Sequence, residues 1–199
     1  MKIMENIIEA VSRYVVVFLS ENLSEHLSFH NIEHTYDVVR AAGEIGMQCS
    51  FSQEEMQIVQ VAAWFHDCGY VNAYIGHEQE SKKIAKAFLE SYGCKESFIE
   101  AVLCCIESTK YPQNPSSLTE KVVCDADLYH LTKPSYAKYE RALRKEFEKY
   151  LGLCYTNEEW QKENCNFLTH HQFHTDYGRK ILAKFKEVNL QFLNCSEYI

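Results

Sequence analysis

Apolar side chains recur every three or four positions along most of this chain, which contains few stretches of alternating apolar and polar residues. That spacing is typical of amphipathic helices rather than strands. Seven glycines and three prolines in 199 residues leave long segments without a helix breaker. We therefore expect an all-α protein with helices over residues 3–20, 32–47, 53–67, 77–92, 96–109, 117–132, 135–151, 156–170 and 174–192.

Several of these helices have recognisable ends. Ser52, with Glu55 three residues later, is typical of an N-terminal capping box. Gly69 and Gly93 lie where helices are expected to stop. No repeat, low-complexity tract or linker divides the chain, so we expect one compact helical-bundle domain over residues 1–199.

Composition narrows the range of partners. A hydrophobic content of 46% is enough to bury a core without disulfides. The formal net charge of −8 argues against a nucleic-acid polymer as ligand, because phosphate backbones are bound by clustered lysine and arginine. The densest basic stretch, "RALRKEFEKY" from Arg141, is interleaved with glutamates and is expected to be a solvated helix face.

The cysteines and the first residues of the chain indicate where the protein functions. The nine cysteines are an odd number without a C-x-x-C pair, so we expect reduced, mostly buried thiols of a cytoplasmic protein. The apolar segment near the start is too short for a membrane span and is flanked wrongly for a signal peptide. We expect no membrane partner, and the sequence allows a homodimer.

Three of the predicted helices bring polar side chains to their apolar faces. His34 begins the apolar face of helix 32–47, and His66 shares the apolar face of helix 53–67. Asp67 follows one step around that helix, at an end where the peptide dipoles disfavour an anion. A buried carboxylate there needs a cation, which is either a divalent metal ion or a lysine or arginine.

A third helix supplies another acid. Asp127 lies four residues after Val123 and four before Leu131, on an apolar face. Asp125 lies on a less clearly buried side and is expected to support a ligand or cap a neighbouring segment. Two imidazoles and two carboxylates would suit Mn²⁺, Fe²⁺, Zn²⁺, Ni²⁺ or, less well, Mg²⁺. For each histidine, a core imidazole bonded to a carbonyl is the alternative.

The order His34, then "HD" at His66 and Asp67, then Asp127 within "DAD", resembles the HD superfamily of metal-dependent phosphohydrolases. The segments "FHNIEHTYDVV", "AAWFHDCGY", "GHEQES", "STKYPQ" and "VCDADLYHL" are similar to those of small bacterial HD proteins, and the resemblance covers about residues 29–175. It implies that these four residues bind one divalent metal ion, and that Asp67 also orients the attacking water. The implied substrate is a small phosphorylated molecule, with a nucleotide favoured.

The resemblance also implies roles for neighbouring residues. "FHNIEH" resembles the H-N-x-x-H segment of animal cyclic-nucleotide phosphodiesterases, which would make His30 the general acid, with a capping or surface role as the alternative. His77 lies where binuclear HD proteins place an additional ligand, but this chain lacks their further histidine before Asp127. A second metal is therefore not expected, and His77 would contact substrate or cap its helix. Lys110 would meet a phosphate or lie in solvent.

Some alternatives stay open at this stage. His170 and His174 have the i, i+4 spacing of a helical zinc pair, with His171 between them, but no acidic partner is near and a surface or packing cluster is favoured. The resemblance leaves three other functions: a non-catalytic signalling or interaction domain, a cyclic-nucleotide phosphodiesterase, and an iron-dependent oxygenase. The complete set of four ligands argues against a non-catalytic domain. The absence of a further histidine between His77 and Asp127 argues against an oxygenase, which needs two irons.

Overall fold

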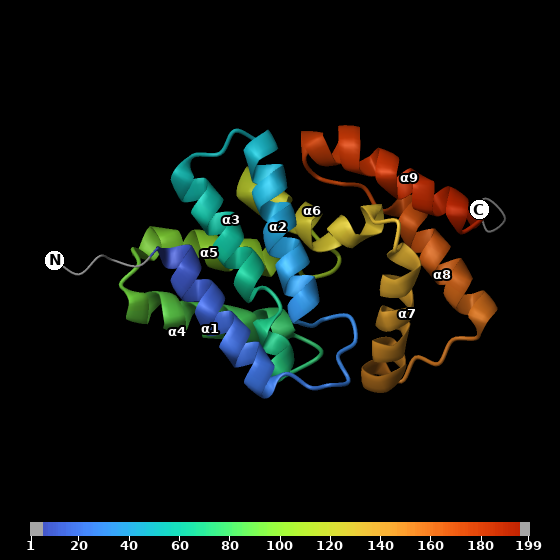
Figure 1. The fold of residues 1–199 in the computed structure, drawn as a ribbon, viewed down its shortest axis with the longest axis horizontal. Coiled ribbons are helices and arrows are strands. Elements are labelled where there is room, and N and C mark those ends of the chain that lie inside the picture. The colour runs from blue at the N-terminus through green and yellow to red at the C-terminus, as the bar shows by residue number, and fades with distance from the viewer. Residues whose placement is uncertain (1–5, 196–199) are drawn as a thin grey trace.

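The computed structural model describes residues 6–195, and the predicted all-α fold is confirmed for them (Figure 1). Two short 3₁₀ helices (η1, η2) and two short π-helical segments (η3, η4) extend or link the α-helices. In chain order the elements are α1 (Ile7–Asn22), α2 (Ile32–Gln48), α3 (Gln53–Phe65), η1 (Cys68–Val71), α4 (His77–Tyr92), α5 (Glu96–Ser108), α6 (Leu118–Asp127), η2 (Leu128–Thr132), α7 (Tyr136–Glu146), η3 (Phe147–Leu151), α8 (Asn157–His170), η4 (Gly178–Leu182) and α9 (Ala183–Phe192).

The main core lies among α1 to α6. Fully buried side chains from all six helices meet there, among them Val15, Ile45, Phe65, Leu89, Ile106 and Val123. α2 packs against both α3 and α6, while α7, α8 and α9 gather at one end of the molecule (Figure 1). A smaller apolar cluster joins η2, α7 and α8 at that end. The packing of α2 against α3 and α6 brings the ends of these three helices together.

The predicted helix signals are confirmed at two positions. Ser52 and Glu55 form a reciprocal capping box at the start of α3. Gly93 ends α4 with a φ of 87°, a left-handed conformation that favours glycine.

Other predicted helices differ in their bounds. The segment predicted as one helix over 117–132 changes from α to 3₁₀ geometry after Asp127. Those predicted over 135–151 and 174–192 each contain a π turn. Apolar spacing identifies a helix but does not distinguish these geometries, since their periods are close. Residues 3–5 of the first predicted helix lie outside the described part of the chain.

Gly69 does not end a helix, so that prediction is wrong. α3 already ends at Phe65, and Gly69 lies inside η1 without a positive φ. Its role is close contact, because an added Cβ would lie 1.9 Å from the carbonyl oxygen of His77 and 2.7 Å from the backbone nitrogen of Ser81. The Gly69 N–H also donates to the Ser81 hydroxyl at 2.8 Å. Gly69 therefore holds the segment after "HD" against the start of α4.

The expectation of reduced thiols is wrong for two cysteines. Cys165 of α8 and Cys195, just after α9, form a disulfide across 30 residues of sequence. The spacing of cysteines along the chain did not reveal this pair, because it is created by the packing of α8 against α9. The other seven cysteines are free, and Cys104 and Cys154 are exposed.

Within residues 6–195, no helix combines the length and the apolar character needed to cross a membrane.

A Gly69→Ala substitution should lower the free energy of unfolding by about 1–3 kcal/mol, because the new methyl group must displace the α4 backbone. Chemical denaturation measures the loss. Gly43→Ala is the matched control: its Cβ would meet only the tip of the Gln60 side chain, at 3.2 Å, so its stability should be unchanged or up to about 1 kcal/mol higher. Equal stability of the two variants would refute the close-contact role of Gly69.

Candidate metal centre

Three helix ends position the residues that the sequence singled out. His34 lies in the first turn of α2, where the Asn31 side chain caps the helix by accepting from the backbone N–H of His34. His66 caps the end of α3 and Asp67 follows it. Asp127 is the last residue of α6. Each side chain is thus fixed by the end of a helix that is itself anchored in the core.

The structure brings the four predicted ligands together. His34 Nε2 lies 3.2 Å from Asp127 Oδ1 and 3.5 Å from Asp67 Oδ2. His66 Nε2 lies 3.1 Å from Asp67 Oδ2 and 3.6 Å from Asp127 Oδ1. The donor atoms of His34, His66 and Asp127 all lie within 4.8 Å of one another, an arrangement that could hold a metal ion.

The donor atoms also suit a cation chemically. His66 Nε2 and Asp67 Oδ2 are fully buried and have no hydrogen-bond partner in the described part of the chain. The other nitrogen of His66, Nδ1, lies 2.7 Å from the carbonyl oxygen of Ala63. If Nδ1 donates to that carbonyl, Nε2 keeps its lone pair, which is the form of histidine that binds metals. Buried lone pairs without a donor are costly, and a bound cation would compensate for them.

Electrostatics gives the same indication. Burial by itself would lower the pKa of His66, but the carboxylates of Asp67 and Asp127 raise it well above its usual value. Burial would raise the pKa of both aspartates, yet the surrounding imidazoles lower them. A proton on His66 is therefore the alternative to a bound cation for balancing the two carboxylates. A divalent cation would take over that balancing role and release protons on binding.

His77 lies on the other side of Asp67. Its Nε2 is 3.6 Å from Asp67 Oδ1 and 3.7 Å from Glu78 Oε1, while its Nδ1 lies 3.2 Å from the carbonyl oxygen of Tyr74. Glu78 is itself buried, and the sequence did not single it out. His77 is therefore adjacent to the centre through the Asp67 oxygen that faces away from His34 and His66.

Asp125 faces away from the centre. It was expected on a less clearly buried side of its helix, but it is fully buried. Its Oδ1 accepts from the backbone N–H of His174 at 2.7 Å, and its Oδ2 accepts from the backbone N–H and the hydroxyl of Thr175 at 2.9 and 2.7 Å. Burial raises the pKa of Asp125 despite these bonds. Asp125 thus joins the end of α6 to the segment before η4.

Lys110 is exposed after the end of α5, and its binding of a phosphate stays a prediction. A residue of the following loop, Gln113, reaches the centre instead: its Nε2 lies 3.4 Å from Asp127 Oδ2. The sequence offered no signal for Gln113, because a polar side chain in a loop is ordinary.

The three late histidines do not form a helical metal pair. α8 ends at His170, so the i, i+4 spacing to His174 crosses a helix end. His170 is exposed, whereas the His171 ring contacts the rings of Phe167 and Phe173. Burial lowers the pKa of His171 to about 4.

His30 has partners that the sequence did not indicate. Its Nδ1 lies 2.6 Å from a carboxylate oxygen of Glu146, and the ring of Tyr70 stacks between those of His30 and His77, with centroid distances of 4.3 and 3.8 Å. Glu146 belongs to the stretch expected to be a solvated helix face, but its side chain is fully buried. That expectation is wrong for Glu146. In a stretch of interleaved basic and acidic residues, the sequence does not show which single acid points into the protein.

His130 also went unnoticed in the sequence. It is buried beside Phe29, at a ring distance of 4.9 Å, and its Nδ1 lies 3.2 Å from the carbonyl oxygen of Asp127. Burial first, and then the nearby His34, lower the pKa of His130 to about 3. A neutral imidazole thus contacts the backbone of Asp127, one of the predicted ligands.

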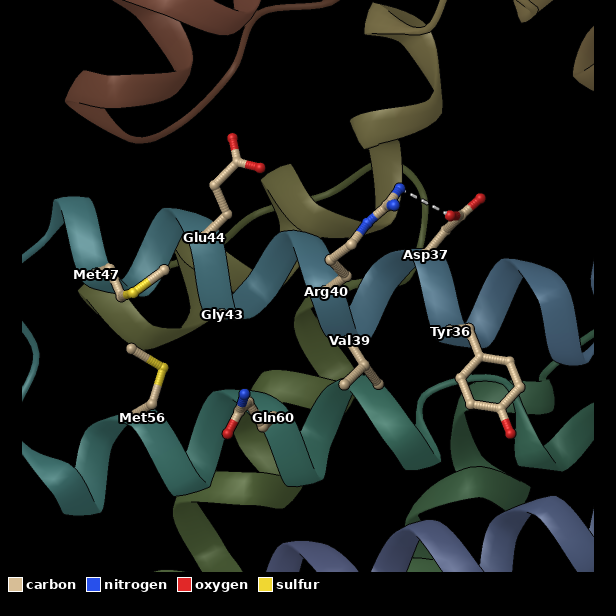
Figure 2. Close-up of a pocket in the computed structure, with 9 residues that line it drawn as sticks. All are labelled: Tyr36, Asp37, Val39, Arg40, Gly43, Glu44, Met47, Met56 and Gln60. Atoms are coloured by element: carbon tan, nitrogen blue, oxygen red, sulfur yellow. Dashed lines mark hydrogen bonds and ion pairs between the residues drawn. The ribbon is translucent and has the colours of Figure 1, made fainter.

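A cavity of about 850 Å³ lies apart from these residues, between the outer faces of α2 and α3 (Figure 2). Tyr36, Arg40 and Met47 of α2 line it together with Met56 and Gln60 of α3. None of the four predicted ligands lines this cavity, so it is separate from the candidate metal centre.

Replacing Asp125 with alanine should lower the free energy of unfolding by about 2–4 kcal/mol, because the partly buried N–H of His174 and the buried N–H of Thr175 lose their acceptor. Metal content should not change. Denaturation and metal analysis of the purified variant measure the two quantities. Asp176→Ala, at an exposed neighbouring acid, should shift stability by no more than about 0.5 kcal/mol. If the Asp125 variant lost its metal without losing stability, Asp125 would be a metal ligand and the predicted structural role would be wrong.

Comparison with known proteins places this centre in a family. The model of the HD domain family matches residues 31–132, just over half of the chain. No curated protein sequence matches the chain significantly.

Solved structures share the fold across most of the chain. A predicted HD superfamily hydrolase from an uncultured Thermotogales bacterium is 19% identical, with a TM-score of 0.65 over 98% of this chain and 100% of that one. YpgQ from Bacillus subtilis, in complex with ADP, is 19% identical, with a TM-score of 0.66 over 96% and 93%. A Lactobacillus plantarum protein is 15% identical, with a TM-score of 0.68 over 96% and 94%. The matched segment of 31–132 contains His34, His66, Asp67 and Asp127, and the chain belongs to the HD domain family.

Proposed function

We propose that this protein is a metal-dependent phosphohydrolase that cleaves a phosphoester or phosphoanhydride bond of a small molecule, with nucleotides as the first candidates. The observation that carries the proposal is the convergence of His34, His66, Asp67 and Asp127. Two buried donor atoms of this cluster have no hydrogen-bond partner among residues 6–195. Membership of the HD domain family supports it. The ADP in the YpgQ structure supports testing nucleotides first.

His34, His66, Asp67 and Asp127 would hold one divalent ion. When bound, such an ion supplies a Lewis acid for a phosphoryl oxygen and lowers the pKa of water. Mixed nitrogen and oxygen donors suit Mn²⁺, Fe²⁺, Zn²⁺, Ni²⁺ or Mg²⁺, so supply in the cell would decide among them.

The remaining groups would act on water and substrate. Asp67 has a second oxygen, Oδ1, on the His77 side, where it could orient the attacking water while Oδ2 faces the ligand nitrogens. His30 would donate a proton to the leaving oxygen from Nε2, because its Nδ1 is occupied by Glu146. His77, beside Asp67, would contact the substrate. The net charge of −8 supports a small substrate rather than a nucleic-acid polymer.

Purified protein should bind about one equivalent of a divalent metal ion and hydrolyse a member of a substrate panel. The products would be free phosphate or pyrophosphate, or a nucleoside monophosphate where the substrate is a cyclic nucleotide. The panel contains nucleoside mono-, di- and triphosphates and cyclic nucleotides, each tested with the five candidate metals. Asp67→Ala should reduce turnover at least about 100-fold. Loss of a residue that merely supports a metal ligand lowers metal affinity or activity by about 10–100-fold, and loss of the ligand itself should lower activity at least as much. A chelator should abolish turnover, and added metal should restore it.

Asp176→Ala controls for the loss of an acid, since Asp176 is exposed and paired with Arg179 and Lys180 on the surface. Its turnover should match that of the parent protein. If the protein binds none of the five metals, or if turnover survives the Asp67 substitution, the proposed function is wrong.

A further inference from the structure

Glu146 is a buried acid whose ion-pair partner is an imidazole. It ends α7, where the helix continues into the π turn η3, and its side chain is fully buried. A carboxylate in such a place carries a large desolvation cost unless hydrogen bonds and an opposite charge compensate for it. The ion pair that the described residues provide for Glu146 is with His30, at 2.6 Å, rather than with a lysine or arginine.

The carboxylate holds His30 at both its backbone and its ring. Oε1 accepts from the backbone N–H groups of Phe29 and His30 at 2.5 and 3.0 Å. Oε2 lies 2.6 Å from His30 Nδ1 and accepts from the Tyr74 hydroxyl at 3.4 Å. The Tyr70 ring lies 4.3 Å from the His30 ring at an interplanar angle of 27°, so the imidazole plane is restrained as well.

These contacts leave His30 one usable nitrogen next to the metal centre. The His30 ring lies 6.0 Å from the His34 ring and 6.3 Å from the His77 ring, between centroids. Glu146 occupies Nδ1, while Nε2 makes no hydrogen bond with the described residues. An imidazole whose Nδ1–H donates to a carboxylate is fixed in one tautomer and one orientation.

We propose that Glu146 is a positioning residue for the reaction: it keeps the hydrogen of His30 on Nδ1 and so presents Nε2 as the atom that exchanges a proton with the substrate. This inference rests on the proposed function, in which His30 is the proton donor. The attacking water forms the new P–O bond and the leaving oxygen keeps the electron pair of the broken one. His30 enters this step as the imidazolium, with one hydrogen on each nitrogen. The leaving oxygen takes the proton from Nε2, which leaves the neutral ring with its hydrogen on Nδ1 beside Glu146. The proton lost by the attacking water passes to solvent, and solvent returns a proton to Nε2.

The first measurement needs no activity. In protein with ¹⁵N-labelled histidine, the His30 ring resonances, assigned with a His30→Asn variant, should show the hydrogen on Nδ1. In Glu146→Gln the amide oxygen can still accept from the two backbone N–H groups, while its NH₂ faces Nδ1 and turns that nitrogen into an acceptor. The neutral ring should then carry its hydrogen on Nε2. Glu148→Gln, at an exposed acid two residues along, should leave the ring unchanged.

The second measurement uses turnover of the substrate identified by the panel. Glu146→Gln should lower kcat about 10–100-fold, with KM and metal content nearly unchanged, because the group that it orients acts in the transition state. Glu146→Asp, which keeps the charge, should recover part of the loss and serves as the test if the glutamine variant does not fold. In a His30→Ala background, Glu146→Gln should have little further effect, because both substitutions remove the same function.

The outcomes separate the two proposals. An unchanged His30 tautomer in Glu146→Gln overturns the inference, whether or not the protein is a phosphohydrolase. Full additivity of the His30 and Glu146 substitutions also overturns it, because Glu146 would then act only through stability of the fold. A tautomer change in a protein that hydrolyses nothing on the panel would support the structural coupling and refute the phosphohydrolase.

Discussion

The candidate centre depends on the neutralisation of two carboxylates at helix ends. Asp67 is buried where the peptide dipoles of α3 disfavour an anion, and Asp127 is largely buried opposite it. The imidazoles of His34 and His66 each lie close to both carboxylates, and no lysine or arginine of the described chain pairs with either one. That choice of partner matters chemically, because imidazoles can exchange their protons for a metal ion and an ammonium group cannot bind one.

The surrounding scaffold is arranged to keep this cluster in place. Gly69 allows the chain after Asp67 to lie directly against the start of α4, which also places His77 beside the cluster. The hydrogen bond of Asp125 with the backbone N–H of His174 joins the last turn of α6 to the segment at residue 174. This contact restrains the backbone at Asp127, two residues later. Glu146, at the end of α7, restrains the His30 ring through a contact with Nδ1. Each of these contacts joins segments that are far apart in the sequence.

The candidate centre and the large cavity occupy different faces of α2. His34 faces α3 and α6 at one end of that helix, whereas Tyr36 and Arg40 line the outer cavity shown in Figure 2. This cavity therefore does not contain the four predicted ligands. The chemistry of the buried donor atoms identifies the candidate centre, because their lone pairs are costly to leave unpaired.

The sequence by itself determined the helices, the capping box at Ser52 and the ligand candidates. Helical periodicity and the dipole argument at Asp67 depend only on neighbouring residues. Tertiary structure alone decided the disulfide of Cys165, the close contact at Gly69 and the burial of Glu146. These features arise where helices pack against one another, and the pairing of distant segments is set by the packing of the whole core rather than by any local pattern of residues.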